Sequence, residues 1–495
     1  MEKRKMIIRK GAALLLTTLM LLAVAVLPGC STAPSETSGA PSPSQSSAPA
    51  PSSGGVGVTS SPDPEPDPEP VDLGGYEFVF LSAWGAENAI FNPTNGSSPA
   101  ADARYERIRA LEKEHNFTVK INTLPMDNFE QELFAQTMAG IKAADIVLHT
   151  VGGILRYYSA GMLNDFNEIT APNLNLDDIT RWDPAATNAG TLNGKRYACY
   201  LTNQYRMGAI CYYNKTLLAE KGCPDPYELY AADRWTWDEF QKLLEYMTIY
   251  ETGGATPDIY GLGRQPWGCI YLELALVYAN GGVVVEDGPD GFRFGLADQN
   301  AQDALLFAKS IYDNNWIIPG VPDDIMFLED IFPKRKVAFW FDSNISGYQE
   351  TINNMPDEFG ILPIPKGPAA DDYVSVTGMV VNYFQPITVK PADYFASSFI
   401  FNAITEPLSA DIDPSFDPEW VLRNSWRVDE GSIQVLKYLE PRVVYTEVVD
   451  LFVFHDIVLP AIASCTMEGA TTPRAAMEAI AEQAQACIDD IFIAK

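Results

Sequence analysis

The sequence predicts an α/β fold built in two lobes, and two observations carry that prediction. Between residues 76 and 150, short apolar runs typical of strands alternate with segments of helical spacing, an order that produces a parallel sheet with right-handed crossovers. The folded body runs from about residue 73 to residue 495, which is more chain than one hydrophobic core usually serves. Apolar residues make up 47% of the sequence, so material for two large cores is available.

The first lobe follows from its hydrophobic periodicity. The predicted elements are a strand over 76–82, a helix over 101–116, a strand over 117–121, a helix over 128–141 and a strand over 144–150. The last strand is continuously apolar, as expected of a strand buried on both faces. Ligands bind beyond the carboxyl ends of such strands, so Trp84 and Thr150 are candidate site residues.

The remaining elements are predicted from periodicity and from helix boundary signals. They are strands over 208–214, 336–344 and 358–368, a strand or hairpin over 373–384, and helices over 234–247, 301–315, 391–405 and 471–493. Thr236 and Glu239 have the spacing of a capping box, and Trp235 and Phe240 stand at the positions of a hydrophobic staple. This spacing predicts a helix start and assigns the neighbouring tryptophans to packing.

The N-terminus has the form of an export signal. A basic head precedes an uncharged apolar run, which is slightly shorter than the ~20 residues of a spanning helix. The following "LPGC" at 27–30 resembles the lipobox of bacterial lipoproteins, although Pro28 replaces the usual small residue. The resemblance implies cleavage of residues 1–29, a lipid on the new N-terminal Cys30, and a place on the extracytoplasmic face of the bacterial cell membrane. The alternative is an uncleaved membrane anchor.

Residues 30–72 form a tether between that cysteine and the folded body. The segment consists largely of Ser, Pro, Ala, Gly and Thr and ends in "PDPEPDPEP". Almost no apolar side chain is present to offset the chain entropy, so we predict a disordered segment that proline and acidic repulsion keep extended.

Charge and cysteine content exclude several classes of protein. The net charge is −31, and the basic leader contributes +4, so the mature chain is near −35, a sign that disfavours a nucleic-acid binder. Besides Cys30 there are six cysteines, without any C-x-x-C pair, so no zinc site is expected. Burial as small apolar side chains is the default for them, with Cys199 and Cys211 as the pair to test for a disulfide.

Six segments in order along residues 76–490 resemble the family 1 extracellular solute-binding proteins, the sugar-capturing subunits of ABC importers. They are "GKRYACY", "CYYNKTLLAEKG", "WTWDEF", "KVAFWFDSN", "FGILPIPKGP" and "GATTPRAAMEAIAEQAQ". The resemblance implies a periplasmic-binding-protein-like fold, in which hinge strands join two parallel-sheet lobes and the ligand lies between them. It places lobe one at 73–200 plus 365–430 and lobe two at 201–362 plus 432–495, with crossings at "LTNQYRMG" and "LPIPKGP".

A sugar offers a ring of C–H bonds to aromatic side chains and a rim of hydroxyls to polar ones. The candidates are therefore aromatic and polar residues beyond strand ends or at crossings, and ordinary packing is the alternative for each. They are Trp84, Thr150, Asn203, Gln204, Tyr205, Trp267, Trp340, Asp342, Thr377 and Gly378.

Two other functions are compatible with parts of the sequence. The three histidines, His115, His149 and His455, have no nucleophile motif beside them, but a glycosidase needs only two carboxylates, which the sequence cannot exclude. A surface adhesin also fits the lipid and tether, although such modules are more often all-β sandwiches. The favoured interpretation is a monomeric, non-enzymatic receptor without cofactor or metal. It would capture a carbohydrate, of an identity that the sequence leaves open, for separate ABC permease and ATPase subunits.

Overall fold

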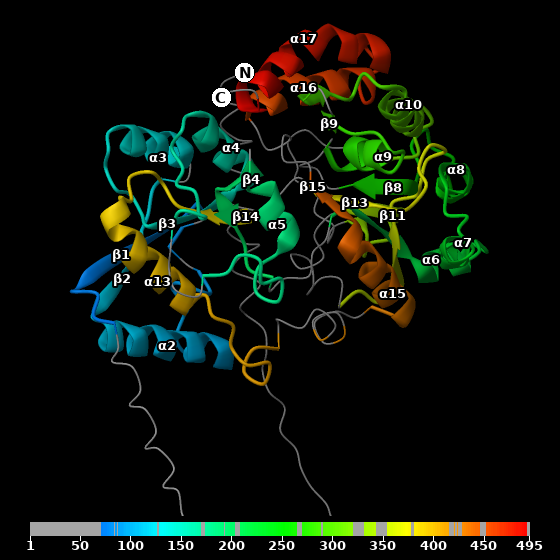
Figure 1. Ribbon diagram of the computed structural model, residues 1–495. Coiled ribbons are helices and arrows are strands. Elements are labelled where there is room, and N and C mark those ends of the chain that lie inside the picture. Colours follow the sequence, from blue (N-terminus) through cyan, green and yellow to red (C-terminus); the bar gives the residue numbers. More distant parts are fainter. Residues whose placement is uncertain are drawn as a thin grey trace, which may run out of the picture.

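The chain folds into two bodies, each built around one sheet (Figure 1). The computed structural model describes residues 71–492, apart from 84, 87, 126–127, 170–173, 193, 203–207, 265–269, 289–290, 320–330, 343–353, 378–380, 415–419, 421–422, 424–427 and 446–451. We call the body that holds the N-terminal strands the first body and the other the second body. The predicted α/β class and the two lobes are confirmed.

The first sheet has the strand order β2-β1-β3-β14-β6. Its strands are β1 (Tyr76–Ser82), β2 (Phe117–Asn122), β3 (Ile146–Thr150), β14 (Val381–Phe384) and β6 (Ala198–Cys199). β1 runs parallel to β2 and β3, as the alternation of strands and helices predicts, whereas β14 is antiparallel to both β3 and β6. Consecutive residues Ile146, Val147 and Leu148 of β3 are all buried, which explains its unbroken apolar sequence.

Helices cover both faces of the first sheet. They are α2 (Pro99–His115), α3 (Phe129–Met138), α4 (Val151–Ser159), α5 (Pro184–Ala189), the 3₁₀ turn η4 (Pro391–Asp393) and α13 (Tyr394–Ile404). α2 begins where Ser98 accepts a hydrogen bond from the Ala101 amide, and it ends at Asn116 with a left-handed backbone. α13 packs against α2 and β1, so the chain returns to the N-terminal sheet late in the sequence.

The second sheet has the strand order β12-β7-β11-β8. Its strands are β12 (Phe359–Pro363), β7 (Ile210–Asn214), β11 (Val337–Asp342) and β8 (Tyr260–Arg264). β11 is parallel to β8, whereas β7 is antiparallel to both of its neighbours, so this sheet is mixed. Every residue of β7, β11 and β12 is buried, which makes these strands the centre of the larger hydrophobic core.

The second body carries most of the helices, with α16 and α17 together at the top of Figure 1. They are α6 (Lys215–Glu220), α7 (Pro226–Ala231), α8 (Trp237–Met247), the π-helical turn η2 (Ile270–Leu274), α9 (Ala275–Tyr278), α10 (Gln299–Asp313), α15 (Glu430–Leu439), the 3₁₀ turn η6 (Glu440–Arg442), α16 (Phe452–Cys465) and α17 (Pro473–Phe492). Two short hairpins are also described, β4 (Thr191–Leu192) with β5 (Lys195–Arg196), and β9 (Val285–Gly288) with β10 (Gly291–Phe294). Within the described ranges, no helix has both the length and the apolar character needed to span a membrane.

Helix α8 begins where the sequence predicts, but without the predicted capping box. Thr236 is its N-cap, yet the Thr236 side chain makes no capping hydrogen bond. Glu239 instead accepts a hydrogen bond of 2.9 Å from Arg234, which draws its carboxylate away from the helix start. The hydrophobic staple is confirmed, because the rings of Trp235 and Phe240 pack with their centroids 5.3 Å apart.

The segment over 373–384 is two strands in two different sheets rather than a hairpin. β13 (Ser375–Thr377) pairs in parallel with β15 (Val443–Tyr445), whereas β14 joins the first sheet. The Gly367 amide donates to Ala279 of the second body, and Val376 lies in that body's core. Gly367 and Val376 therefore contact the second body, and β14 joins the first sheet. The domain bounds stay predictions.

The described cysteines are free thiols, and most of them are buried. Cys199 lies in the core of the first sheet and Cys211 in the core of the second, so this pair forms no disulfide. Burial raises the pKa of both thiols, which suits their role as small apolar side chains.

Candidate functional site between the two sheets

The strands of both sheets end where the chain passes from one body to the other. In the first sheet, β3 ends at Thr150, directly opposite Val381, the first residue of β14 after the crossing. In the second sheet, β11 ends at Asp342, opposite Ile210, the first residue of β7 after the earlier crossing. β8 is parallel to β11 and ends beside it at Arg264. The carboxyl ends of parallel strands from both sheets thus lie at the crossing, where ligands of α/β proteins usually bind. We call this region the interlobe edge.

Three chain segments lie side by side at the crossing. The Ser375 hydroxyl accepts a hydrogen bond from the Gly208 amide and donates one to the Ala209 carbonyl, each 3.0 Å long. The Ala209 amide donates to the Val376 carbonyl at 2.6 Å, and β13 continues the pairing to β15. A Cβ atom on Gly208 would lie 2.4 Å from the Val376 carbonyl oxygen, so only glycine allows this approach. These contacts join 208–209 to 375–376 close to where the chain passes between the two bodies.

The structure describes only some of the sequence-predicted ligand residues. Those outside the described residues are Trp84, Asn203, Gln204, Tyr205, Trp267 and Gly378, together with the lipidation site Cys30. Thr150 and Thr377 are the last residues of β3 and β13, so their backbone lies at the interlobe edge. For all of these residues, contact with a ligand stays a prediction.

Trp340 and Asp342 are buried in the core of the second body. Both are 0% exposed, and the Trp340 indole donates a hydrogen bond of 3.0 Å to Asp342. A Cβ atom on Gly263 of β8 would lie 2.5 Å from the Trp340 ring, so the neighbouring strand leaves room for the indole by carrying glycine there. In this structure Trp340 is therefore a core residue, and its contact with a ligand stays a prediction.

The hydrophobic core of the second body continues into the first body, which the sequence analysis did not foresee. Leu155 of α4, Ala186 of α5 and Leu192 of β4 belong to the same cluster of buried residues as the second sheet. α17 packs against α4, so the C-terminal helix contacts both bodies. No periodicity could have shown this, because α17 has one apolar face and the sequence does not say which body that face covers.

A buried acidic group lies in the second body, in the turn that follows β8 in the chain. Glu273 of η2 is 0% exposed, and its Oε1 accepts hydrogen bonds from Tyr312 (2.9 Å) and Thr466 (3.2 Å). Burial raises the pKa of Glu273, and the nearby positive charge of Arg264 opposes that shift. Arg264 is half-buried at the end of β8 and donates to the Met467 sulfur at 3.1 Å. The sequence analysis missed Glu273, although a single acid within the apolar run "IYLELALVYA" is a usable signal.

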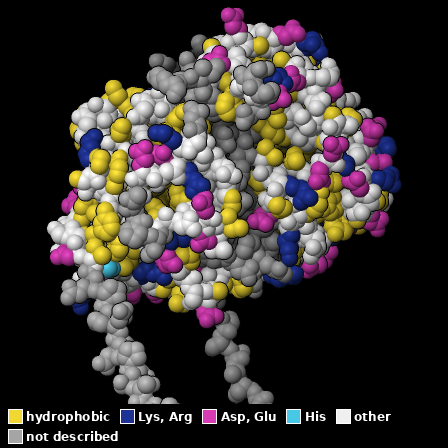
Figure 2. All heavy atoms as spheres, viewed as in Figure 1, with side chains coloured by type: hydrophobic (Ala, Val, Ile, Leu, Met, Phe, Trp, Pro, Cys, Tyr) yellow, Lys and Arg dark blue, Asp and Glu magenta, His cyan; other side chains and the backbone are white. Residues whose placement is uncertain are grey.

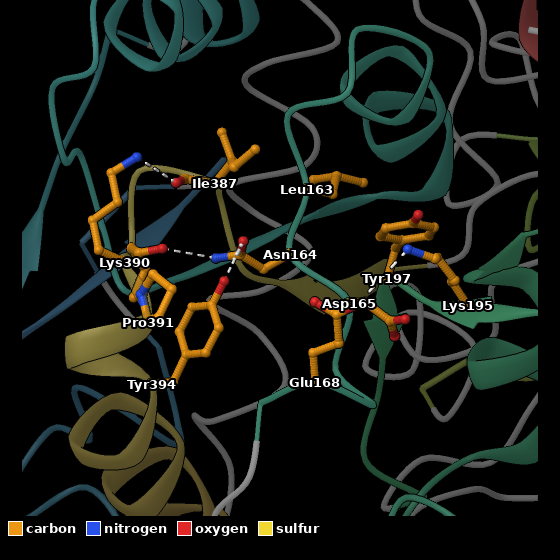
Figure 3. Close-up of a pocket in the computed structure, with 11 residues that line it drawn as sticks. Leu163, Asn164, Asp165, Glu168, Lys195, Tyr197, Ile387, Lys390, Pro391 and Tyr394 are labelled. Atoms are coloured by element: carbon orange, nitrogen blue, oxygen red, sulfur yellow. Dashed lines mark hydrogen bonds and ion pairs between the residues drawn. The ribbon is translucent and has the colours of Figure 1, made fainter. Parts of the chain in front are cut away.

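A separate cavity of about 340 Å³ lies in the first body, at the end of β14 away from the crossing (Figure 3). Figure 3 shows Asn164 between the loop after β14 and Tyr394. Asn164 donates to the carbonyls of Pro386 and Val389 and accepts from the Tyr394 hydroxyl. Its polar atoms are thus occupied within the protein, and the arrangement ties η4 and α13 to the sheet.

The two histidines whose side chains are described make packing and polar contacts within the first body. His149 of β3 is buried beside Phe129, and its Nε2 lies 3.7 Å from Glu130. The His115 ring at the end of α2 bonds the Val71 carbonyl at 3.0 Å and packs against Phe399. The side chain of His455 lies outside the described residues. Within the described residues, no group of three or more potential ligands is arranged to hold a metal ion.

Charges of both signs are mixed on the molecular surface. Figure 2 shows lysine and arginine side chains interspersed with aspartate and glutamate over both bodies on the face in view. That face therefore offers no continuous basic surface of the kind that nucleic acid binds.

Comparison with known proteins gives a family match and many similar structures. The family model for bacterial extracellular solute-binding proteins matches residues 95–386. An ABC substrate-binding protein from Listeria monocytogenes, solved with cycloalternan, is 15% identical with a TM-score of 0.57, covering 84% of this chain and 98% of its own. UgpB from Mycobacterium tuberculosis, solved with glycerophosphocholine, is 17% identical with a TM-score of 0.54, and the match covers 84% of this chain and 99% of UgpB. A maltose/maltodextrin-binding domain from Bdellovibrio bacteriovorus, bound to maltotriose, is 15% identical with a TM-score of 0.54, and the match covers 83% of this chain and 98% of that domain. No protein with curated annotation matches the sequence significantly.

Proposed function

Because the chain belongs to the bacterial extracellular solute-binding proteins, we propose that it captures a carbohydrate at the interlobe edge and delivers it to an ABC permease. The permease and its ATPase are separate chains that recognise the ligand-bound form. The observation that carries the proposal is the convergence of strand ends from both sheets on one crossing, in a fold shared over nearly their whole length with proteins solved with sugars.

Capture needs no chemical step on the ligand. A sugar that contacts both bodies only when they are closed stabilises the closed state by its differential affinity for the two states. The hinge residues around Gly208 and Ser375 absorb the change, and the permease reads the closed form. On this proposal the protein is a monomeric receptor and not an enzyme.

The predicted ligand residues have the chemistry that a sugar needs. Trp84 and Trp267 offer flat apolar faces to the C–H side of the rings. Asn203 and Gln204 offer amides that both donate and accept, which suits hydroxyl groups. These residues follow strands or lie on the crossing segment, so closure of the two bodies would bring them around one ligand.

The N-terminal residues keep the receptor at the cell surface. Cleavage after Gly29 makes Cys30 the N-terminal residue, and Cys30 carries the lipid. Its anchor has more than one acyl chain, because a single chain binds a membrane only weakly. The tether over 31–72 lets the folded body reach the permease while it stays attached to the membrane.

A thermal-shift screen tests the carbohydrate proposal. Maltotriose, cycloalternan, other neutral oligosaccharides, glycerophosphocholine and short peptides are each added in excess. A neutral sugar should raise the melting temperature, since ligand at one hundred times Kd adds about 2.7 kcal/mol to stability. Stabilisation by glycerophosphocholine or peptides alone would overturn the carbohydrate class. Chromatography of the sugars after incubation is the control, and cleaved products would favour the glycosidase alternative instead.

A further inference from the structure

The cavity in the first body has walls from three chain segments that are far apart in the sequence. They are 163–168 after α4, 195–197 at β5, and 387–394 between β14 and α13. The Asn164 backbone amide donates to the Gln385 carbonyl at 3.0 Å, and the Phe166 amide donates to the Arg196 carbonyl at 2.7 Å. Hydrogen bonds of the backbone thus join the three walls. The cavity volume of about 340 Å³ lies within the range of small-molecule sites.

Asp165 places a buried carboxylate on the wall of this cavity. The residue is 8% exposed, and its Oδ1 accepts hydrogen bonds from the backbone amides of Asn167 (2.9 Å) and Arg196 (3.1 Å). Among the residues that the structure describes, none donates to Oδ2, and no lysine or arginine forms an ion pair with Asp165. A buried carboxylate oxygen is costly unless a donor reaches it, and a positively charged donor forms the stronger bond.

The two lysines that line the cavity do not supply that donor. Lys195 Nζ lies 3.8 Å from Glu168 Oε1, and both of these side chains are more than half exposed. Lys390 donates to the Ile387 carbonyl at 3.1 Å, and Figure 3 shows Lys390 and Asp165 on opposite sides of the cavity. The side of the cavity that holds Asp165 and Glu168 is therefore the side that suits a positive charge.

Aromatic and apolar groups form the rest of the lining. The Tyr394 hydroxyl donates to Asn164 at 2.9 Å, which fixes the position of that ring. Burial raises the pKa of the Tyr197 hydroxyl, and the negative charges of Asp165 and Glu168 add to this shift. The face of a tyrosine ring attracts a cation, so both rings suit the same ligand as the carboxylates. The apolar lining residues are Leu163, Ile387, Val389 and Pro391.

We propose that this cavity is a second ligand site, which binds a small organic cation. The ammonium group of the ligand donates to Oδ2 of Asp165 and pairs with Glu168, and its carbon body lies against Tyr197 and Tyr394. A free diamine and an amino sugar both carry such a group on a body of suitable size. The site lies away from the crossing, so it does not depend on the proposed capture of a sugar at the interlobe edge.

Calorimetric titration of the full chain with matched pairs of compounds tests the ligand class. Putrescine is compared with 1,4-butanediol, and glucosamine is compared with glucose, at about pH 6, where the amines carry their charge. At least one amine should bind, more tightly than its neutral partner, and the amine that binds more tightly identifies the source of the cation. Absence of binding by both amines, or equal affinity for charged and neutral partners, would overturn the proposal.

Substitution of Asp165 places the binding in this cavity. Asp165→Asn keeps an oxygen for the two backbone amides but replaces Oδ2 with a donor, so the amine should bind roughly tenfold or more weakly. Glu168→Gln changes an exposed carboxylate and should weaken binding by roughly twofold. Glu245→Gln, on the exposed face of α8, is the matched control and should leave the affinity unchanged. An amine that binds Asp165→Asn as tightly as it binds wild type would contradict the proposal.

Two further measurements keep this test independent of folding and of the proposed function. Melting temperatures show whether each variant folds, and if Asp165→Asn does not fold, the affinity of Glu168→Gln decides the result. The shift in melting temperature caused by maltotriose should be the same in wild type and Asp165→Asn. A changed response to maltotriose would contradict a site separate from the interlobe edge, whereas failure of every sugar to bind concerns the proposed function alone.

Discussion

Single residues set how closely the crossing segments approach. Gly208 lies against the backbone of Val376, and Ser375 links both segments through its hydroxyl. Because the obstacle to a larger side chain at residue 208 is backbone rather than a flexible side chain, the site cannot adjust locally. Any substitution there must separate the two segments.

Gly208→Ala should therefore destabilise the protein by about 1–3 kcal/mol, the usual range for overpacking. It should also weaken sugar binding, because it displaces the hinge. Gly254→Ala is the control, since its nearest neighbour would lie 3.7 Å from the new Cβ, and it should change stability by less than about 0.5 kcal/mol. Urea denaturation measures both, and equal effects of the two variants would contradict this account of the crossing.

The same scale shows where sequence reasoning stops. Trp340 stands in a strand whose residues are all buried, so no alternation indicates which side chains face a ligand. The surroundings of Glu273 come from Tyr312 and Thr466, which are distant in the sequence and meet only in the fold. The sequence indicates which residue types to expect at the site, but not the directions in which their side chains point.

At the scale of elements, the sequence predicted best those features that depend only on residues close together in the chain. The strand over Tyr76–Ser82 and the hydrophobic staple at Trp235 were predicted correctly, because alternation and spacing determine them. The capping box failed because Arg234 competes for Glu239. The segment over 373–384 was misjudged because two adjacent strands joined different sheets, and their partners are far away in the sequence.

Two N-cap residues differ in a way that stability measurements can show. Asn214 ends β7, accepts the Leu217 amide at 2.8 Å and donates to Asp357, whereas Thr236 makes no capping bond. Asn214→Ala should cost about 1–2 kcal/mol, and Thr236→Ala less than about 0.5 kcal/mol. Thermal denaturation of both variants checks this, and a larger loss for Thr236→Ala would contradict the assignment of the caps.

At the scale of the whole molecule, the two-lobed architecture was predicted from length, element order and family resemblance. The domain bounds stay predictions, although Gly367, directly after the predicted crossing, donates its amide proton to Ala279 of the second body. The contact of α17 with α4 depends on how the bodies dock, which no local pattern encodes.

The anchor belongs to this scale, because it decides where the whole receptor works. Cys30→Ala should abolish lipid attachment and move the full chain from the membrane fraction to the soluble fraction of a bacterial host. Mass spectrometry of the N-terminal peptide and detergent partitioning measure this outcome. A variant that stays in the membrane fraction would favour the uncleaved anchor instead.

The central claim is that two bodies close on a sugar at their crossing. Small-angle X-ray scattering of the full chain carrying Cys30→Ala, with and without a saturating sugar from the screen, tests it most directly. Closure predicts a smaller radius of gyration in the presence of the sugar. Superimposable curves at a concentration where the sugar is shown to be bound would contradict the claim.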